Sequence, residues 1–164
     1  MLAAKPATPE VKNEEAYARQ FATIPELAHL GPLLKSSKPV SLTEQETEYV
    51  TSVVKHTFND HVVLQYIIKN TLNDQLLERV SVTLDFDNEE LDAEQIVPVK
   101  QLVFNQPESC FISLRKQAGT YPTATFSNTL KFIVKDCDPE TFEPDEEGYD
   151  DEYAVSHLVT SKYW

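Results

Sequence analysis

Acidic side chains are densest between Asp136 and Glu152, where ten of the seventeen residues are Asp or Glu. Carboxylates at this density are typical of three things: a site for a hard cation, a disordered acidic tail, or a solvated loop of a folded domain. The spacing of the carboxylates and the elements that flank them decide among these interpretations.

Calcium is the metal that this acidic run fits best. Asp136, Asp138 and Glu140 alternate, and Glu147 is the twelfth residue counted from Asp136, as in the ligand spacing of an EF-hand loop. Such a loop needs glycine at its sixth position, and this chain has Thr141 there. We therefore favour an ordered, solvated acidic loop, and we keep a calcium-regulated β-sandwich binding module as the alternative function.

Other chemistry has less support in the sequence. With three glycines in the whole chain, there is no phosphate-binding loop and no nucleophile motif around a serine. His56, His61 and the two cysteines lack the close pairing that is usual for ligands of structural zinc. We predict no catalytic residue, no metal site and no cofactor, and hence a protein that is not an enzyme.

Composition limits the partners and the compartment. The net charge of -13 argues against nucleic acid or an anionic membrane surface as a direct partner, and leaves a basic partner open. Cys110 and Cys137 show no CxxC spacing, and the chain has no Asn-x-Ser/Thr site, so we expect reduced thiols in a cytoplasmic protein. No apolar run approaches the roughly 20 residues of a membrane span, so we expect no direct membrane insertion.

The elements that must position the acidic run begin near residue 41. Residues 1–40 contain five of the ten prolines and are predicted to be a linker with short helical segments. In this linker Tyr17, Phe21 and Ile24 share one helical face that Pro25 should end, and a second short helical segment is predicted to follow up to Gly31. The helical face either packs on its own domain or docks on a partner, and the periodicity leaves both open.

From residue 41 onward the pattern is that of strands. About seven alternating or β-branched segments are separated by short turns, at 47–58, 61–70, 77–86, 95–104, 109–116, 120–136 and 152–159. The absence of helical patterns between them predicts an all-β fold, an immunoglobulin-like antiparallel β-sandwich, with Pro98 at an edge strand or a bulge. The acidic run is then a connection inside the fold. The predicted core comprises Val53, Val63, Leu64, Val82, Leu84, Phe111, Phe132 and Val134.

Several segments resemble one known family. "IPELAHLGPLLKSSKPVSLTE", "NTLNDQLLERVSV", "FNQPESCF" and "KFIVKDCDPETFEPDEEGYDDEY" are similar, in this order, to the coatomer gamma subunit of the COPI vesicle coat, over roughly residues 14 to 160. The resemblance implies the end of the linker, at 1–40, followed by the sandwich part of the C-terminal appendage, at 41–164. It also implies that the platform subdomain of the appendage is absent from this chain.

The resemblance also implies a function. We expect a non-enzymatic structural and protein-interaction module of the COPI coat, used in Golgi-to-ER retrograde and intra-Golgi transport. Its expected partners are other coatomer subunits and accessory proteins of the coat. Its expected location is cytoplasmic, and peripheral on Golgi membranes and COPI vesicles through the coat.

Electrostatics suggests where a partner binds. A connection rich in carboxylates attracts segments that carry Lys or Arg, over a range of about 8 Å in physiological salt. Tyr149 and Tyr153, which are interleaved with the carboxylates, either add contacts to such a segment or pin the loop to the sandwich. The candidate partner contacts are Asp145, Glu146, Glu147 and Tyr149 in the acidic run, Tyr153 directly after it, and Tyr17, Phe21 and Ile24 in the linker helix.

Overall fold

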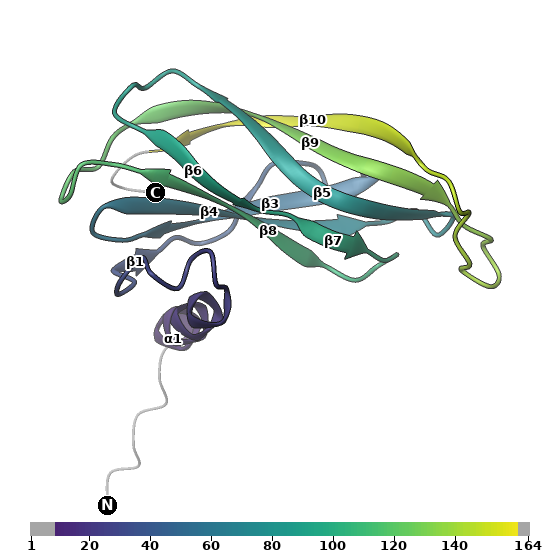
Figure 1. Ribbon diagram of the computed structural model, residues 1–164, viewed down its shortest axis with the longest axis horizontal. Coiled ribbons are helices and arrows are strands. Elements are labelled where there is room, and N and C mark those ends of the chain that lie inside the picture. Colours follow the sequence, from purple (N-terminus) through teal and green to yellow (C-terminus); the bar gives the residue numbers. More distant parts are fainter. Residues whose placement is uncertain (1–8, 161–164) are drawn as a thin grey trace, which may run out of the picture.

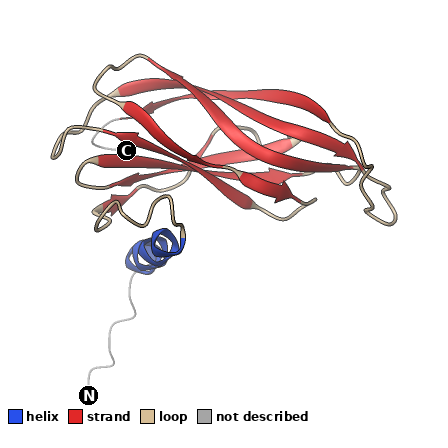
Figure 2. Cartoon of the chain, viewed as in Figure 1, coloured by secondary structure: helices blue, strands red, loops and turns tan. Residues whose placement is uncertain are grey.

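Two antiparallel sheets pack face to face, and one helix lies against the outside of one of them (Figure 1). The computed structural model describes residues 9–160. Strands dominate this part of the chain (Figure 2), as the alternating segments predicted. The prediction of an all-β sandwich preceded by a short helix is confirmed.

The first sheet has the strand order β1-β3-β4-β8-β6, and β2 also pairs with β3. Its strands are β1 (Lys35–Ser36), β2 (Val40–Ser41), β3 (Tyr49–Thr57), β4 (His61–Asn70), β6 (Asp92–Val97) and β8 (Glu108–Arg115). The second sheet has the order β10-β9-β5-β7, with β5 (Gln75–Phe86), β7 (Val99–Leu102), β9 (Ala124–Asp136) and β10 (Tyr149–Thr160).

Pro98 divides one predicted strand into two. The segment 95–104 forms β6 at the edge of the first sheet and β7 at the edge of the second, and Pro98 is the residue between them. Proline has no N–H for a ladder hydrogen bond, so the chain changes sheets where that bond would be missing. Pro98 was predicted to mark an edge strand or a bulge, and the two strands on either side of it are both edge strands.

The main core lies between the two sheets. Val53, Leu64, Leu130 and Val134 are fully buried there, and the hydroxyl of Tyr66 donates a hydrogen bond of 2.6 Å to Asn128 of the opposite sheet. Seven of the eight predicted core residues are buried, although Val63 and Phe111 lie on the other face of the first sheet, under the helix. Leu84 is only half-buried, because burial along β5 decreases towards its C-terminal end.

The segment predicted to be a linker packs on the sandwich where it is described. Helix α1 (Pro9–Thr23) ends before Pro25, as predicted. The second helical segment is absent from the described residues: the chain instead makes successive turns, in which Leu27 N–H donates to Ile24 C=O and Leu30 N–H donates to Leu27 C=O. Leu27 and Leu30 are buried, so packing of these two side chains decides the path of the chain here.

We expect the two leucines on β9 and β5 to differ sharply in their contribution to stability. Leu130→Ala should lower the free energy of unfolding by roughly 2–5 kcal/mol, because its side chain is fully buried between the sheets. Leu84→Ala should cost clearly less, because part of its side chain already contacts water. Urea unfolding of both variants checks this, and equal losses would contradict the packing described above.

Candidate functional site: the acidic hairpin and the covered sheet face

The acidic run forms the tip of a β-hairpin. β9 ends at Asp136 and β10 begins at Tyr149, so the loop itself is 137–148 and the last three carboxylates belong to β10. Two backbone contacts close the loop across its base. Cys137 and Pro144 form an isolated antiparallel β-bridge, and Asp145 N–H donates a hydrogen bond of 2.8 Å to Asp136 C=O. The run is therefore an ordered part of the fold. β10 starts three residues earlier than the predicted segment 152–159.

Asp138 holds the tip of this hairpin in place. Its Oδ1 accepts hydrogen bonds from the N–H groups of Glu140 (2.8 Å) and Thr141 (3.3 Å), and its C=O accepts one from Phe142 at 2.7 Å. These bonds explain how Phe142 adopts a positive φ of 60°. The carboxylate of Asp138, one of the ligands that the calcium hypothesis needed, thus stabilises the turn instead.

The described residues do not assemble a metal site. Between residues 9 and 160, no group of three or more His, Cys, Asp or Glu side chains is placed to hold an ion. Burial raises the pKa of the Cys110 thiol to about 12, which keeps it protonated. No helix among the described residues has the length and the apolar character needed to cross a bilayer.

The candidate contacts in the hairpin differ in their exposure. Asp145, Glu146 and Glu147 are exposed, and Tyr149 is 51% exposed. Tyr153 instead packs edge-on against Tyr49, with ring centroids 5.3 Å apart, and so contributes to the core. The tyrosine closer to the loop is therefore available to a partner, and the other one anchors β10.

The aromatic side chain at the hairpin tip was not predicted from the sequence. Phe142 is 51% exposed and stacks on Phe104 of the β7–β8 loop, with ring centroids 6.2 Å apart and planes 11° apart. A single phenylalanine among carboxylates gives no periodic signal. Its contact with Phe104 depends on the sandwich bringing two distant loops to the same end of the molecule.

The linker helix covers the outer face of the first sheet. Phe21 is 4% exposed and meets His56, Phe58 and Phe111 edge-on, with ring centroids 4.7, 5.2 and 5.9 Å away. Tyr17 and Ile24 are half-buried in the same cluster. All three side chains thus contact their own domain in this structure, and their role as partner contacts stays a prediction.

A polar cluster lies under the helix. His56 Nδ1 is 2.7 Å from Ser36 Oγ and His56 Nε2 is 2.8 Å from Gln65 Oε1, and Gln65 also exchanges hydrogen bonds with Gln20 of α1. The Gln65 oxygen only accepts, so Nε2 carries the hydrogen and Nδ1 accepts from Ser36. Burial lowers the pKa of His56 to about 4, although the Gln65 hydrogen bond opposes this shift.

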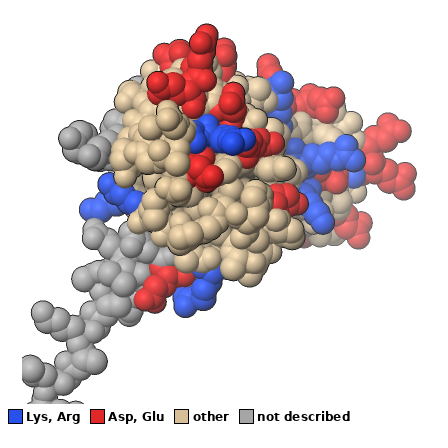
Figure 3. All heavy atoms as spheres, turned by 60° about the vertical axis from the view of Figure 1, so that its left-hand side comes forward, with Lys and Arg blue, Asp and Glu red and all other residues tan. Residues whose placement is uncertain are grey.

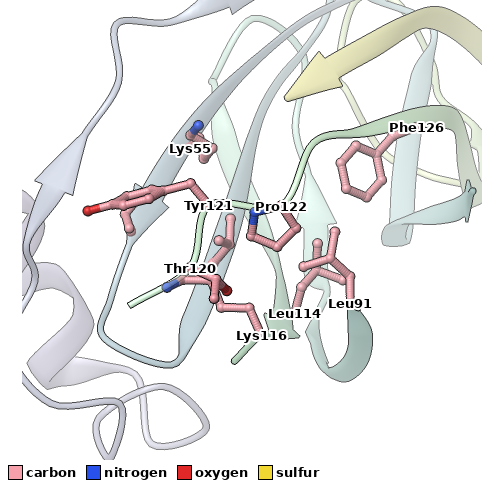
Figure 4. A pocket seen from close by; sticks show the side chains of 10 residues that line it. Lys55, Leu91, Leu114, Lys116, Thr120, Tyr121, Pro122 and Phe126 are labelled. Atoms are coloured by element: carbon pink, nitrogen blue, oxygen red, sulfur yellow. The ribbon is translucent and has the colours of Figure 1, made fainter. Parts of the chain in front are cut away.

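A small pocket lies at one end of the sandwich. Leu91, Leu114 and Phe126 lie on one side, with Lys55, Lys116 and Tyr121 on the other (Figure 4). Its volume of about 20 Å³ holds about one water molecule, so it is not a substrate site. Burial lowers the pKa of Lys55 to about 8, helped by the charge of Lys35, while Lys116 donates to Asn59 C=O at 2.9 Å.

Comparison with known proteins identifies the family. Residues 15–160, which are most of the chain, match the family model described as "Coatomer gamma subunit appendage platform subdomain". The chain belongs to the coatomer gamma subunit family. Rat coatomer subunit gamma-1 is 50% identical over 149 residues, zebrafish gamma-2 is 47% identical over 148, and human gamma-2 is 43% identical over 160.

These matches cover nearly all of this coatomer gamma chain and a small part of its relatives. The alignments span 89% of the chain for the rat and zebrafish proteins and 96% for the human protein, but only 17–18% of the relatives. The matched family model has "platform" in its description, whereas the span folds here as a helix and a two-sheet sandwich. Our division into a linker at 1–40 and a sandwich at 41–164 without a platform stays a prediction.

The buried histidine predicts a pH dependence of stability. The pKa of His56 falls from 6.5 to about 4 on folding, so the unfolded chain binds the proton first as the pH falls. Stability is therefore retained above about pH 6.5 and lost between about pH 6.5 and 4. From pH 7 to pH 5, His56 should account for about 2 kcal/mol of this loss.

Urea unfolding of the wild type and of His56→Gln at both pH values measures this effect. The variant has no imidazole to protonate, so its loss between pH 7 and 5 should be smaller by about 2 kcal/mol, whatever its stability at pH 7. An equal loss in both proteins would show that His56 is not neutral and buried in solution.

Proposed function

We propose that this chain is a non-enzymatic structural and protein-interaction module of the COPI vesicle coat, in Golgi-to-ER retrograde and intra-Golgi transport. Membership of the coatomer gamma family and the match to its appendage support this proposal. The module lies in the cytoplasm, on Golgi membranes and COPI vesicles, and is held there by the coat. Its partners are other coatomer subunits and accessory proteins.

The acidic hairpin is the part of the surface that we propose for partner contact. Asp145, Glu146 and Glu147 are exposed, and within the described residues no ion pair engages them. Tyr149 beside them adds an exposed ring that an Arg or Lys side chain can cover. Since these charges are not neutralised within the domain, they are free to attract Lys- and Arg-bearing segments of a protein.

The charge distribution on the surface favours a basic protein over an anionic partner. On the face shown in Figure 3, carboxylates project at the top and at the right, and the fewer Lys and Arg side chains form no continuous patch. Phosphate groups need such a patch, whereas a basic segment needs the carboxylates. Exposure of unpaired charges at the hairpin is the observation that carries the proposal.

The test replaces Asp145 by Asn and both Glu146 and Glu147 by Gln, and measures binding of a synthetic Lys/Arg-rich peptide by calorimetry. Exposed ion pairs contribute about 0.2–1 kcal/mol each, so affinity should fall roughly 3- to 150-fold at low salt and less at physiological salt. The unfolding free energy should change little, because the three side chains are exposed.

A matched control removes the same charge at another place. Glu89→Gln, Glu90→Gln and Asp92→Asn neutralise three exposed carboxylates, two in the β5–β6 connection and one at the first residue of β6, at the other end of the sandwich (Figure 1). This variant should bind the peptide as the wild type does. If both triple variants weaken peptide binding equally, the effect comes from the net charge of the chain and not from the hairpin. If the hairpin variant binds the peptide as the wild type does, the hairpin is not the binding site. Calorimetric titration with Ca²⁺ tests the alternative function in the same samples.

A further inference from the structure

Two aromatic rings are exposed together at the hairpin end of the sandwich, and the charged contact proposed above does not use them. Phe142 is 51% exposed and stacks on Phe104, and Val103 beside Phe104 is 40% exposed. None of these three side chains belongs to the two core clusters. The patch is therefore an apolar part of the surface and not an extension of the core, and apolar side chains that are exposed together mark sites of interaction.

The hairpin loop holds Phe142 in this position before any partner binds. Asp138 N–H donates a hydrogen bond of 3.0 Å to Glu143 C=O, and Phe142 N–H donates one of 2.7 Å to Asp138 C=O. The carboxylate of Asp138 fixes the residues between them through its bonds to the N–H groups of Glu140 and Thr141. Binding loses less entropy when the contacting side chain is already ordered, so a partner meets a preformed apolar surface.

Four loops make up this end of the sandwich, at 42–48, 71–74, 103–107 and 137–148. Backbone hydrogen bonds connect them: Thr71 N–H donates to Glu48 C=O, Asn105 N–H to Asn70 C=O, and Cys137 N–H to Asp74 C=O. The four loops contain ten acidic residues, all of them exposed, and neither Lys nor Arg. The exposed aromatic pair therefore lies at an end of the molecule whose loops carry negative charge only.

These charges decide which kind of partner can reach the rings. Of the ion pairs among residues 9–160, none involves one of the ten loop carboxylates, and Lys135 at the base of the hairpin is paired with Glu78 at 2.6 Å. A second copy that used the same end would bring like charges together, and the phosphates of a membrane or a nucleic acid would be repelled in the same way. Charge complementarity therefore selects a basic protein segment.

We propose that the Phe142–Phe104 pair binds an aromatic side chain of a protein segment that carries Arg or Lys directly beside that side chain. The inference rests on the proposed function, and it adds an apolar determinant to the charges that attract the segment. Glu143 follows Phe142 in the chain and Glu140 precedes it by two residues, and both are exposed. A basic residue next to the bound ring is then within reach of a carboxylate, so the two parts of the segment are recognised together.

Calorimetry with three synthetic peptides tests the proposal. The first peptide has Trp between Arg residues, the second has Ser in place of Trp, and the third keeps Trp but has Glu in place of each Arg. The additional aromatic contact should make the wild type bind the first peptide roughly 2- to 12-fold more tightly than the second. The third should show no measurable binding, because the carboxylates of the loops repel it.

Substitutions at one position show whether Phe142 is responsible for this preference. Phe142→Asn removes the ring without changing the charge, and Asn tolerates the left-handed backbone of this residue. This variant should bind the two Arg peptides with equal affinity, whereas Phe142→Tyr keeps a ring and should keep the preference for Trp. The control Leu34→Asn removes a side chain that is 56% exposed at the other end of the sandwich, where Leu34 N–H donates to Thr57 C=O, and should keep the preference as well.

Three results would overturn the proposal: a wild type that binds the Trp and Ser peptides equally, a preference for Trp that survives Phe142→Asn, or equal binding of the Arg and Glu peptides. Thermal melting shows whether each variant is folded. Sedimentation equilibrium without peptide tests the other occupant, because association that Phe142→Asn abolishes would assign the rings to a second copy of the chain.

Failure of the proposed function gives a different result. In that case the hairpin variant with Asp145→Asn, Glu146→Gln and Glu147→Gln binds the Ser peptide as the wild type does, whatever the preference for Trp. If the wild type binds the Ser peptide and the hairpin variant does not, but Trp adds nothing, the hairpin is the binding site and the aromatic pair is not part of it. If the wild type binds neither Arg peptide, both proposals are wrong.

Discussion

The first sheet has two apolar faces, and the second sheet can cover only one of them. Val53 and Leu64 point into the sandwich, while Phe58, Val63 and Phe111 point away from it. Leaving that outer face in water would cost about 25 cal/mol for each Å² of apolar surface. The residues before the sandwich must therefore cover it, and this requirement decides the path of the chain from α1 to β2.

The same requirement explains why the predicted linker joins the domain. Five of the ten prolines lie before residue 41 and indicated a boundary near residue 40, and this is a local signal. Burial of Phe21, Leu27 and Leu30 is a tertiary effect that composition does not report. β1 and β2 then add to β3, so the boundary seen in the composition is not a break in the packing.

Sequence periodicity predicted strand positions best where the strand is buried and has regular pairing without bulges. β4 has the bounds that the β-branched segment 61–70 predicted, and Pro98 marked the change of sheet correctly. Bulges and loop contacts were beyond reach, because they depend on pairing between distant segments. Arg79 in a left-handed conformation and the stacking of Phe142 on Phe104 belong to this class, and both contribute to the exposed surface.

The acidic run serves different purposes along its length. Asp138 shapes the turn, the three carboxylates from Asp145 to Glu147 face water near the base of the loop, and those on β10 protect a strand edge. Gly148 belongs to the structural part, because a Cβ at this position would approach Ile133 Cγ2 and Val134 O to 2.7 Å. Since the first residues of β10 carry three carboxylates, pairing of this part of the edge with the same segment of another copy is disfavoured.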